Sequence, residues 1–256
     1  MTNAAPDLAP VRRRLAGVVL RSPLVGVTSL GGRPVAPGLR AKLECLQVGG
    51  SAWFRGTFHA LARSLGAHKE VVAHGDVRAA IATVTAAAVQ RIPSRLVLTE
   101  AAVEAFGGPD AVRGGLPAGA PVEVETVADD AAAAGIVRAA RARGASCWPR
   151  LDGVEATVAD PDVYAGLATI GAELAEDMAS DVAVVAVAPA WLVAPVREGL
   201  AAGGRADCRV VAAPEDPDAS WQAAVLRGLR CHSDVAAAFA AALDVGEGPT
   251  VIVLGA

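Results

Sequence analysis

The feature that most constrains the fold is an unbroken apolar run in the second half of the chain. Residues 182–188 read VAVVAVA, with Asp181 directly before them and Pro189 directly after. A run without alternation is typical of a parallel strand covered on both faces, because a strand with one face in water would alternate with polar residues. The run is also too short to cross a membrane. It therefore predicts an α/β protein in which helices cover both faces of a parallel sheet.

Other strand-like segments alternate with alanine-rich helical segments, and glycine or proline separates them. This alternation of strands and helices is typical of a parallel-sheet α/β protein. We expect strands at residues 70–73, 95–99, 122–126, 182–188, 208–213 and 250–254.

Several helix boundaries can be predicted from capping residues. Ser51 can cap a helix, and Asp160 is a second cap because Pro161, which suits the first helical position, follows it. Gly144 is expected to end a helix at residues 131–143, and Gly203 to end one at residues 191–202. The helix capped by Ser51 is expected to bury an apolar stripe of Phe54, Phe58, Leu61 and Leu65.

Composition and charge limit the class of protein. The chain has 256 residues, of which 53% are hydrophobic, and this suffices for one large or two modest domains. A net charge of −4 and the lack of a basic stripe with interleaved aromatic residues indicate no nucleic-acid partner. The sequence shows neither a signal peptide nor an apolar run of spanning length. We therefore expect a cytoplasmic protein with no membrane partner.

The cysteines give no sign of a metal site. Cys45, Cys147, Cys208 and Cys231 form no C-x-x-C pair, and this spacing predicts reduced thiols that serve mostly in packing. Cys45 has no activating base close to it in the sequence, so it is expected to be inert.

Two motifs carry a resemblance to a known family. Residues 42–56, KLECLQVGGSAWFRG, resemble the signature K-x-E-N-L-Q-x-T-G-S-F-K-x-R-G of fold-type II pyridoxal-phosphate (PLP) enzymes, which include threonine and serine dehydratases and the tryptophan synthase β subunit. Residues 162–174, DVYAGLATIGAEL, resemble the family segment D-x-I-A-G-Q-G-T-I-G-x-E-I. The resemblance implies a tryptophan synthase β-like fold and a homodimer. Its large domain would comprise residues 1–67 and 151–256, with residues 68–150 as an inserted small domain.

The departures from the family fall on its cofactor contacts. The Schiff-base lysine falls on Trp53, whose indole nitrogen cannot form an imine. The substrate loop S-S-G-N-H appears as AHGDV at residues 73–77, and the phosphate loop G-G-G-G-L as APAWL at residues 188–192. Pro189 removes a backbone donor from the phosphate loop, and Trp191 fills volume there. Together these losses predict a protein that needs no PLP or other cofactor.

Three residues are candidates for catalysis. His74 and Asp76 lie on the loop after a predicted strand, where open α/β sheets place ligands, and could do acid–base work. The alternative is a surface turn chosen for its turn chemistry. His59 is the third candidate, one helical turn after Arg55, and its alternative is an interface or packing role.

Five residues are candidates for binding a substrate. Trp53 and Trp191 would either plug an obsolete cavity or line a reshaped pocket. Arg78 could anchor an anion or be a solvated residue at a helix start. Ser51 and Arg55 complete the set, since both match the family signature.

Two functions remain open from the sequence. The first is a repurposed, PLP-independent homologue that acts on a small molecule in the cleft between its domains, by lyase, isomerase or cyclase chemistry, possibly within a biosynthetic pathway. The second is a non-catalytic pseudoenzyme that serves as a partner subunit or binds a ligand. The segment between Pro217 and Ser233, which is shorter than in the family, favours the second.

Overall fold

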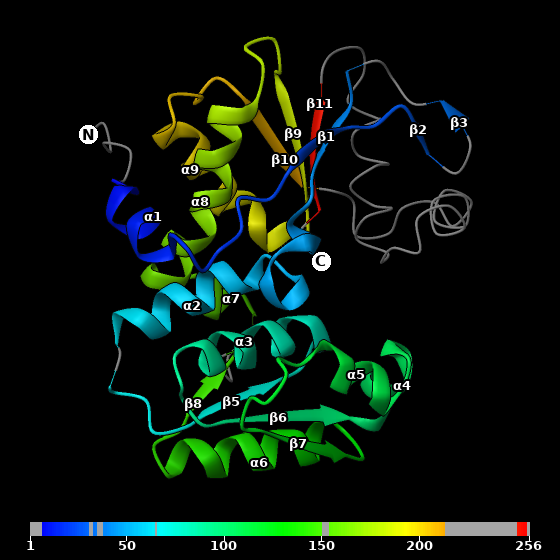
Figure 1. Ribbon diagram of the computed structural model, residues 1–256, viewed down its shortest axis with the longest axis vertical. Helices are drawn as coiled ribbons and strands as arrows, with labels where there is room; N and C mark the ends of the chain where they lie inside the picture. The colour runs from blue at the N-terminus through cyan, green and yellow to red at the C-terminus, as the bar shows by residue number, and fades with distance from the viewer. Residues whose placement is uncertain are drawn as a thin grey trace. The chain divides into compact units, whose positions relative to one another are not determined.

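The computed structural model describes residues 7–30, 33–34, 38–64, 66–149, 154–212 and 250–254. The chain divides into two compact units (Figure 1). The first comprises Met1–Arg13, Leu20–Leu46 and Leu167–Ala256, and the second Arg14–Val19 and Gln47–Gly166. The second unit contains the range 68–150 predicted for the inserted domain and extends beyond it on both sides, so the predicted boundaries themselves stay a prediction.

The first unit is built on a five-stranded sheet with the order β1-β4-β11-β9-β10. These strands are β1 (Leu24–Gly26), β4 (Arg40–Lys42), β11 (Thr250–Leu254), β9 (Val184–Ala188) and β10 (Arg209–Ala212). Only β1 pairs in the antiparallel sense, with β4, among the described pairings of this sheet. The apolar run that predicted a buried parallel strand forms β9, which begins two residues later than expected and lies between β11 and β10.

The remaining described elements of this unit are short, apart from two helices. They are α1 (Ala9–Leu15), β2 (Ser29–Leu30), β3 (Arg33–Pro34), the 3-10 helices η1 (Glu44–Leu46) and η3 (Ala190–Leu192), α8 (Pro161–Asp177) and α9 (Val193–Ala202). The unit boundary falls within α1 and within α8.

Glycines allow α8 and α9 to touch through their backbones. A Cβ atom on Gly199 would lie 1.9 Å from the carbonyl oxygen of Ala168, and one on Gly171 would lie 2.1 Å from that of Val196. Any side chain at these positions would force the helices apart. The abundance of small residues in the sequence thus permits close helix packing in this unit.

The second unit has a four-stranded parallel sheet with the order β7-β6-β5-β8. Its strands are β5 (Val71–His74), β6 (Ser94–Thr99), β7 (Val122–Val127) and β8 (Ser146–Trp148). Its helices are η2 (Val48–Gly50), α2 (Trp53–Arg63), α3 (Val77–Val89), α4 (Glu100–Phe106), α5 (Pro109–Gly115), α6 (Asp130–Ala142) and α7 (Val154–Val158).

Helices cover both faces of this sheet, as Figure 1 shows. On one face, α3, α4 and α5 pack on a core that includes Val84, Leu96 and Val112. On the other, α6 packs through Val137 and Ala140 against Val72 and Val97. The predicted architecture, a parallel sheet between two helical layers, is confirmed.

Ser51 and Asp160 both accept hydrogen bonds at helix starts, although the N-cap residue of α2 is Ala52 and not Ser51. Ser51 Oγ accepts a hydrogen bond from the Trp53 N–H at 3.2 Å, and the Asp160 carboxylate accepts from Asp162 N at 3.0 Å. Gly144, at φ 89°, follows α6 directly after its last turn. Gly203 ends α9, but the predicted helix at 191–202 begins as η3 and becomes α-helical only at Val193.

Three residues of the predicted stripe on α2, namely Phe54, Phe58 and Leu61, are buried. Leu65, Cys231, residue 213 of the predicted strand 208–213, and the segment 217–233 lie outside the described residues. Among the helices of the described chain, none is both long and apolar enough to cross a membrane.

Candidate functional site

Trp53 is a core residue of the second unit. It occupies the first position of α2 and is only 1% exposed. Its indole Nε1–H donates to Thr83 Oγ1 on α3 at 3.1 Å, and the Thr83 hydroxyl donates to the Ala79 carbonyl at 2.8 Å. The polar end of the indole is therefore satisfied inside the protein. Trp53 is thus packed and hydrogen-bonded between α2 and α3, and its two predicted roles, plug or pocket lining, stay predictions.

Ser51 and Arg55 flank Trp53 and are both buried. Ser51 is used at the start of α2, where its hydroxyl accepts from the Trp53 backbone. At Arg55 the backbone is closely approached, because a Cβ atom on Gly166 would lie 2.5 Å from the Arg55 carbonyl oxygen. Gly166 belongs to the second family-like motif, so the two motifs are in contact in the folded chain.

Both ring nitrogens of His59 form hydrogen bonds. Its Nε2 lies 3.0 Å from Nη1 of Arg14, and its Nδ1 lies 3.0 Å from the carbonyl oxygen of Asp162. A guanidinium can only donate and a carbonyl can only accept, so Nδ1 carries the proton and Nε2 accepts. Burial lowers the pKa of His59, and the hydrogen bond to Asp162 opposes that effect. This arrangement is that of a satisfied packing histidine.

His74 and Asp76 have separate partners. His74 is the last residue of β5, and its Nε2 lies 3.0 Å from the Pro149 carbonyl oxygen, so Nε2 carries the proton. Asp76 is exposed and caps α3, accepting from Ala79 N at 2.9 Å. Within the described residues, no hydrogen bond joins the two side chains and nothing occupies His74 Nδ1. The two side chains of the predicted pair are thus not hydrogen-bonded to each other. Among their described contacts, Nδ1 of His74 stays available to accept a proton.

Burial lowers the pKa of His74, an effect that the Pro149 hydrogen bond partly opposes. The imidazole is therefore neutral at neutral pH, with its proton held on Nε2 by Pro149. A neutral imidazole of fixed tautomer is suited to act as a base through Nδ1.

Arg78 lies in the first turn of α3, four residues after His74. Its guanidinium carbon is 5.4 Å from the centre of the Phe106 ring, a cation–π contact. Its Nε is buried and has no hydrogen-bond partner among the described residues. Arg78 is thus oriented by an aromatic ring and retains a donor.

Trp191 belongs to the first unit, where it is half-buried in η3. The two backbone amides that follow it both donate within the chain. The Leu192 N–H donates to the Pro189 carbonyl at 3.1 Å, and the Val193 N–H donates to the Ala190 carbonyl. These amides are therefore not directed at a ligand.

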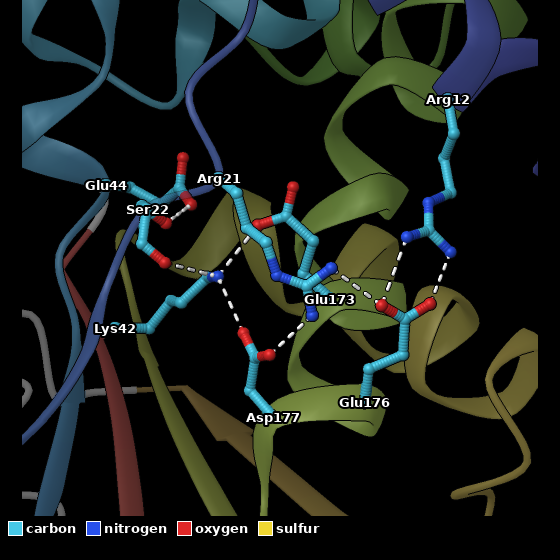
Figure 2. Close-up of polar contacts among 8 residues, drawn as sticks. All are labelled: Arg12, Arg21, Ser22, Lys42, Glu44, Glu173, Glu176 and Asp177. Carbon is cyan, nitrogen blue, oxygen red and sulfur yellow. Dashed lines mark hydrogen bonds and ion pairs between the residues drawn. The ribbon is translucent and has the colours of Figure 1, made fainter. Parts of the chain in front are cut away.

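A buried charge cluster in the first unit was not predicted from the sequence. Lys42 is 0% exposed, and its Nζ lies 2.8 Å from the Ser22 carbonyl oxygen and 2.7 Å from Glu173 Oε2. Figure 2 draws these contacts. Asp177 lies 3.5 Å from the same nitrogen, and Ser22 Oγ donates to the buried Glu44. The signal available in the sequence was that Lys42, Glu44 and Glu173 are charged residues within apolar segments.

The cluster continues to the protein surface through arginines (Figure 2). Arg21 contacts both Asp177 and Glu176, and Arg12 contacts Glu176 at 2.5 Å. The hydrogen bond to Asp177, followed by that to Glu176, raises the pKa of Arg21. The hydrogen bond from Arg12 is the largest cause that lowers the pKa of Glu176. The carboxylates are thus compensated by cations, as buried charges require.

No group of three or more histidine, cysteine or carboxylate residues within the described parts of the chain could hold a metal ion. Of the eight predicted site residues, seven belong to the second unit and Trp191 to the first. The structure joins Ser51 to Trp53 and links none of the three candidate catalytic side chains to another by a hydrogen bond among the described contacts.

Comparison with known proteins gives a consistent family. A family profile described as "Pyridoxal-phosphate dependent enzyme" matches residues 15–254. The chain is similar to the processed form of threonine deaminase isoform 2 from Solanum lycopersicum, with 14% identity, a TM-score of 0.68, and coverage of 99% of this chain and 90% of that one. No curated protein matches the chain significantly.

Two serine racemase structures are also similar. That from Dictyostelium discoideum has 16% identity and a TM-score of 0.68, and the match covers 98% of this chain and 96% of that one. Maize serine racemase has 17% identity and a TM-score of 0.63, with 98% and 92% covered. At such identities the likeness establishes the fold, which is the tryptophan synthase β-like fold that the sequence motifs predicted.

Proposed function

We propose that this chain, which belongs to the pyridoxal-phosphate-dependent enzyme family, works without PLP and acts on a small molecule by acid–base chemistry. The observation that supports the proposal is the burial of Trp53 and its hydrogen bond to Thr83, because the family signature would have its Schiff-base lysine at this position. An indole in this position cannot form an imine and leaves no space for one.

The lysines of the chain support this proposal, because there are only two. Lys42 is fully buried, and its ammonium group is held by Ser22, Glu173 and Asp177. Lys69 is exposed in the connection between α2 and β5. Neither lies at the start of α2, where the family signature has its lysine.

The segment that resembles the phosphate loop does not fit an anion either. A phosphate at a helix N-terminus needs free backbone N–H groups and a close approach of the chain. Here two of the amides donate to the carbonyls of Pro189 and Ala190, and Pro189 itself has no N–H. The residues present therefore do not fit PLP, and no step of the proposed chemistry involves it.

The chemistry that we propose uses His74 as the base. Its Nδ1 would take a proton from the substrate, while the Nε2–H bond to Pro149 holds the ring in place. Arg78, which follows it by four residues across the turn from β5 to α3, would bind an anionic group of the substrate. Eliminations, isomerisations and cyclisations can each begin with such a proton transfer, so lyase, isomerase and cyclase reactions remain the candidates.

A second function, that of a non-catalytic homologue, is favoured by the bonding of Trp53 and His59. Both side chains are satisfied inside the protein, as expected where an old site has been closed rather than rebuilt. Such a protein would bind a ligand or a partner subunit without turning anything over.

Native mass spectrometry of the full chain purified without added cofactor tests the proposal first. A small non-covalent adduct would identify the substrate class, and the same spectrum would report whether the protein is the homodimer implied by the family resemblance. Turnover of that molecule should then fall about 100-fold or more in His74→Gln, a typical loss for a general base. Unchanged turnover in His74→Gln and Arg78→Gln would contradict the assignment. Binding without any turnover would favour the non-catalytic homologue.

A further inference from the structure

A cavity of about 380 Å³ lies in the second unit, beside the edge strand β8. Its walls come from the end of α2, the segment before β5, the end of α6, β8 and the start of α8. The volume is within the roughly 300–1,000 Å³ of small-molecule sites. We infer that this cavity binds a small zwitterion, a molecule that carries both a carboxylate and an ammonium group.

One wall is a chain of three hydrogen-bonded side chains. Ser64 Oγ donates to the Ala60 carbonyl at 3.0 Å and lies 2.6 Å from His68 Nε2, so His68 donates to Ser64. His68 Nδ1 lies 2.5 Å from Ser146 Oγ, which therefore donates to His68 when the imidazole is neutral. Burial lowers the pKa of His68, and this favours the neutral form. The lone pairs of Ser146 Oγ remain as fixed acceptors at the cavity wall.

Two donors line the same cavity and have no partner. Trp148 is only 7% exposed, and its Nε1 has no hydrogen-bond partner among the described residues. A buried indole N–H normally finds an acceptor, so this one is available to a ligand. Arg141, at the end of α6, also lines the cavity and forms no ion pair within the described part of the chain. A carboxylate would satisfy both donors.

The opposite charge is supplied at the start of α8. Asp160 and Asp162 both line the cavity. The Asp162 carboxylate lies 3.2 Å from Arg63 Nε, and the Asp160 carboxylate caps α8 at 3.0 Å from Asp162 N. A carboxylate has two oxygens and about four acceptor positions, so the Asp162 carboxylate has room for an ammonium group beside Arg63, and Asp160 adds negative charge to the same wall. A wall with both signs of charge suits a zwitterion better than a simple anion or cation.

His74 does not line the cavity, although Trp148, which does, directly precedes the Pro149 that bonds to His74. Ser146 pairs with Val71 at the first residues of the parallel strands β8 and β5, whereas His74 is the last residue of β5. The inference therefore goes beyond the proposed function and does not depend on it.

Calorimetric titration of the full chain with glycine, β-alanine and 4-aminobutanoate tests the inference, since these zwitterions differ in the separation of their charges. At least one should bind saturably, and propanoate and ethylamine, with one charge each, should bind at least tenfold more weakly. Arg141→Gln and Trp148→Phe should each weaken the binding about 10- to 100-fold, the usual cost of a lost hydrogen bond to a charged group. Arg143→Gln, which changes an exposed arginine that does not line the cavity, should leave it unchanged.

No saturable binding of any of the three zwitterions would overturn the inference, as would binding that persists in both Arg141→Gln and Trp148→Phe. Thermal unfolding of each variant verifies its fold. If Trp148→Phe unfolds early, Arg141→Gln decides the matter, because Arg141 is exposed. Binding that is lost in Arg78→Gln but kept in Arg141→Gln would place the ligand near His74, and would overturn this inference while supporting the proposed function.

Discussion

Trp53 and Thr83 are joined by a hydrogen bond of 3.1 Å that connects the start of α2 to the middle of α3. The Thr83 hydroxyl in turn donates to the Ala79 carbonyl. The indole nitrogen is thus the first donor in a short chain of hydrogen bonds within the core. Trp53 is therefore a buried structural residue of the second unit.

Replacement of Trp53 should destabilise the protein according to how much of the side chain is removed. Trp53→Ala should lower the free energy of unfolding by about 3–5 kcal/mol, because it leaves a large cavity. Trp53→Phe keeps most of the ring and loses the hydrogen bond to Thr83, so about 1–2 kcal/mol is expected. Chemical denaturation measures both values. Equal stability of Trp53→Ala and the unsubstituted protein would show that Trp53 does not pack as described.

The buried charge of Lys42 should be costly to remove. In Lys42→Met, the carboxylates of Glu173 and Asp177 lose their buried cation, and we expect a loss of about 3–5 kcal/mol. Lys69→Met is the matched control, since Lys69 is exposed, and it should stay within about 0.5 kcal/mol. Similar unfolding midpoints for the two variants would contradict the described cluster.

The contact between α8 and α9 should not accept a side chain at Gly199. Gly199→Ala places a Cβ atom 1.9 Å from the Ala168 carbonyl oxygen, so a clear fall in the thermal midpoint is expected. Gly135→Ala in α6 provides the comparison. A Cβ there meets nothing within 4 Å, and alanine should stabilise the helix by up to about 1 kcal/mol. The prediction fails if both substitutions shift the midpoint in the same direction.

Stability should fall on mild acidification because His59 is held neutral. Burial lowers its folded pKa below the ordinary value of 6.5, so below about pH 6.5 the unfolded chain binds a proton that the folded chain does not. The unfolding free energy should therefore decrease as the pH falls through 6.5, and level off below the folded pKa. His68 and His74 have pKa values shifted in the same direction and add to this slope.

His59→Gln should make this pH dependence shallower, because glutamine cannot take up the proton and its amide can still donate to Asp162 and accept from Arg14. Denaturation series at about pH 7.5 and pH 5.5 measure the difference. A pH slope that is the same with and without His59 would contradict its assignment as a buried neutral imidazole.

The strands and helix ends could be predicted because their signals are local. The apolar run of β9, the cap at Asp160 and the glycine at 144 each act within a few residues of the chain. The family motifs likewise predicted the fold, because each is a continuous segment of the chain.

The partners of the candidate residues could not be predicted, because they are distant in sequence. Glu173 is 131 residues from Lys42, and Ser146 is 78 residues from His68. For the same reason the sequence could not decide whether His59 has a catalytic or a packing role. Its two partners, Arg14 and Asp162, are both distant from it in the chain.

Equilibrium dialysis of the full chain against an equimolar solution of PLP tests the central claim most directly. The account predicts that PLP distributes equally across the membrane, because we propose that Trp53 takes the place of the lysine and because the backbone amides of Leu192 and Val193 donate within the chain. Saturable retention of one PLP per chain would contradict it, and would return this protein to the PLP-dependent chemistry of its family.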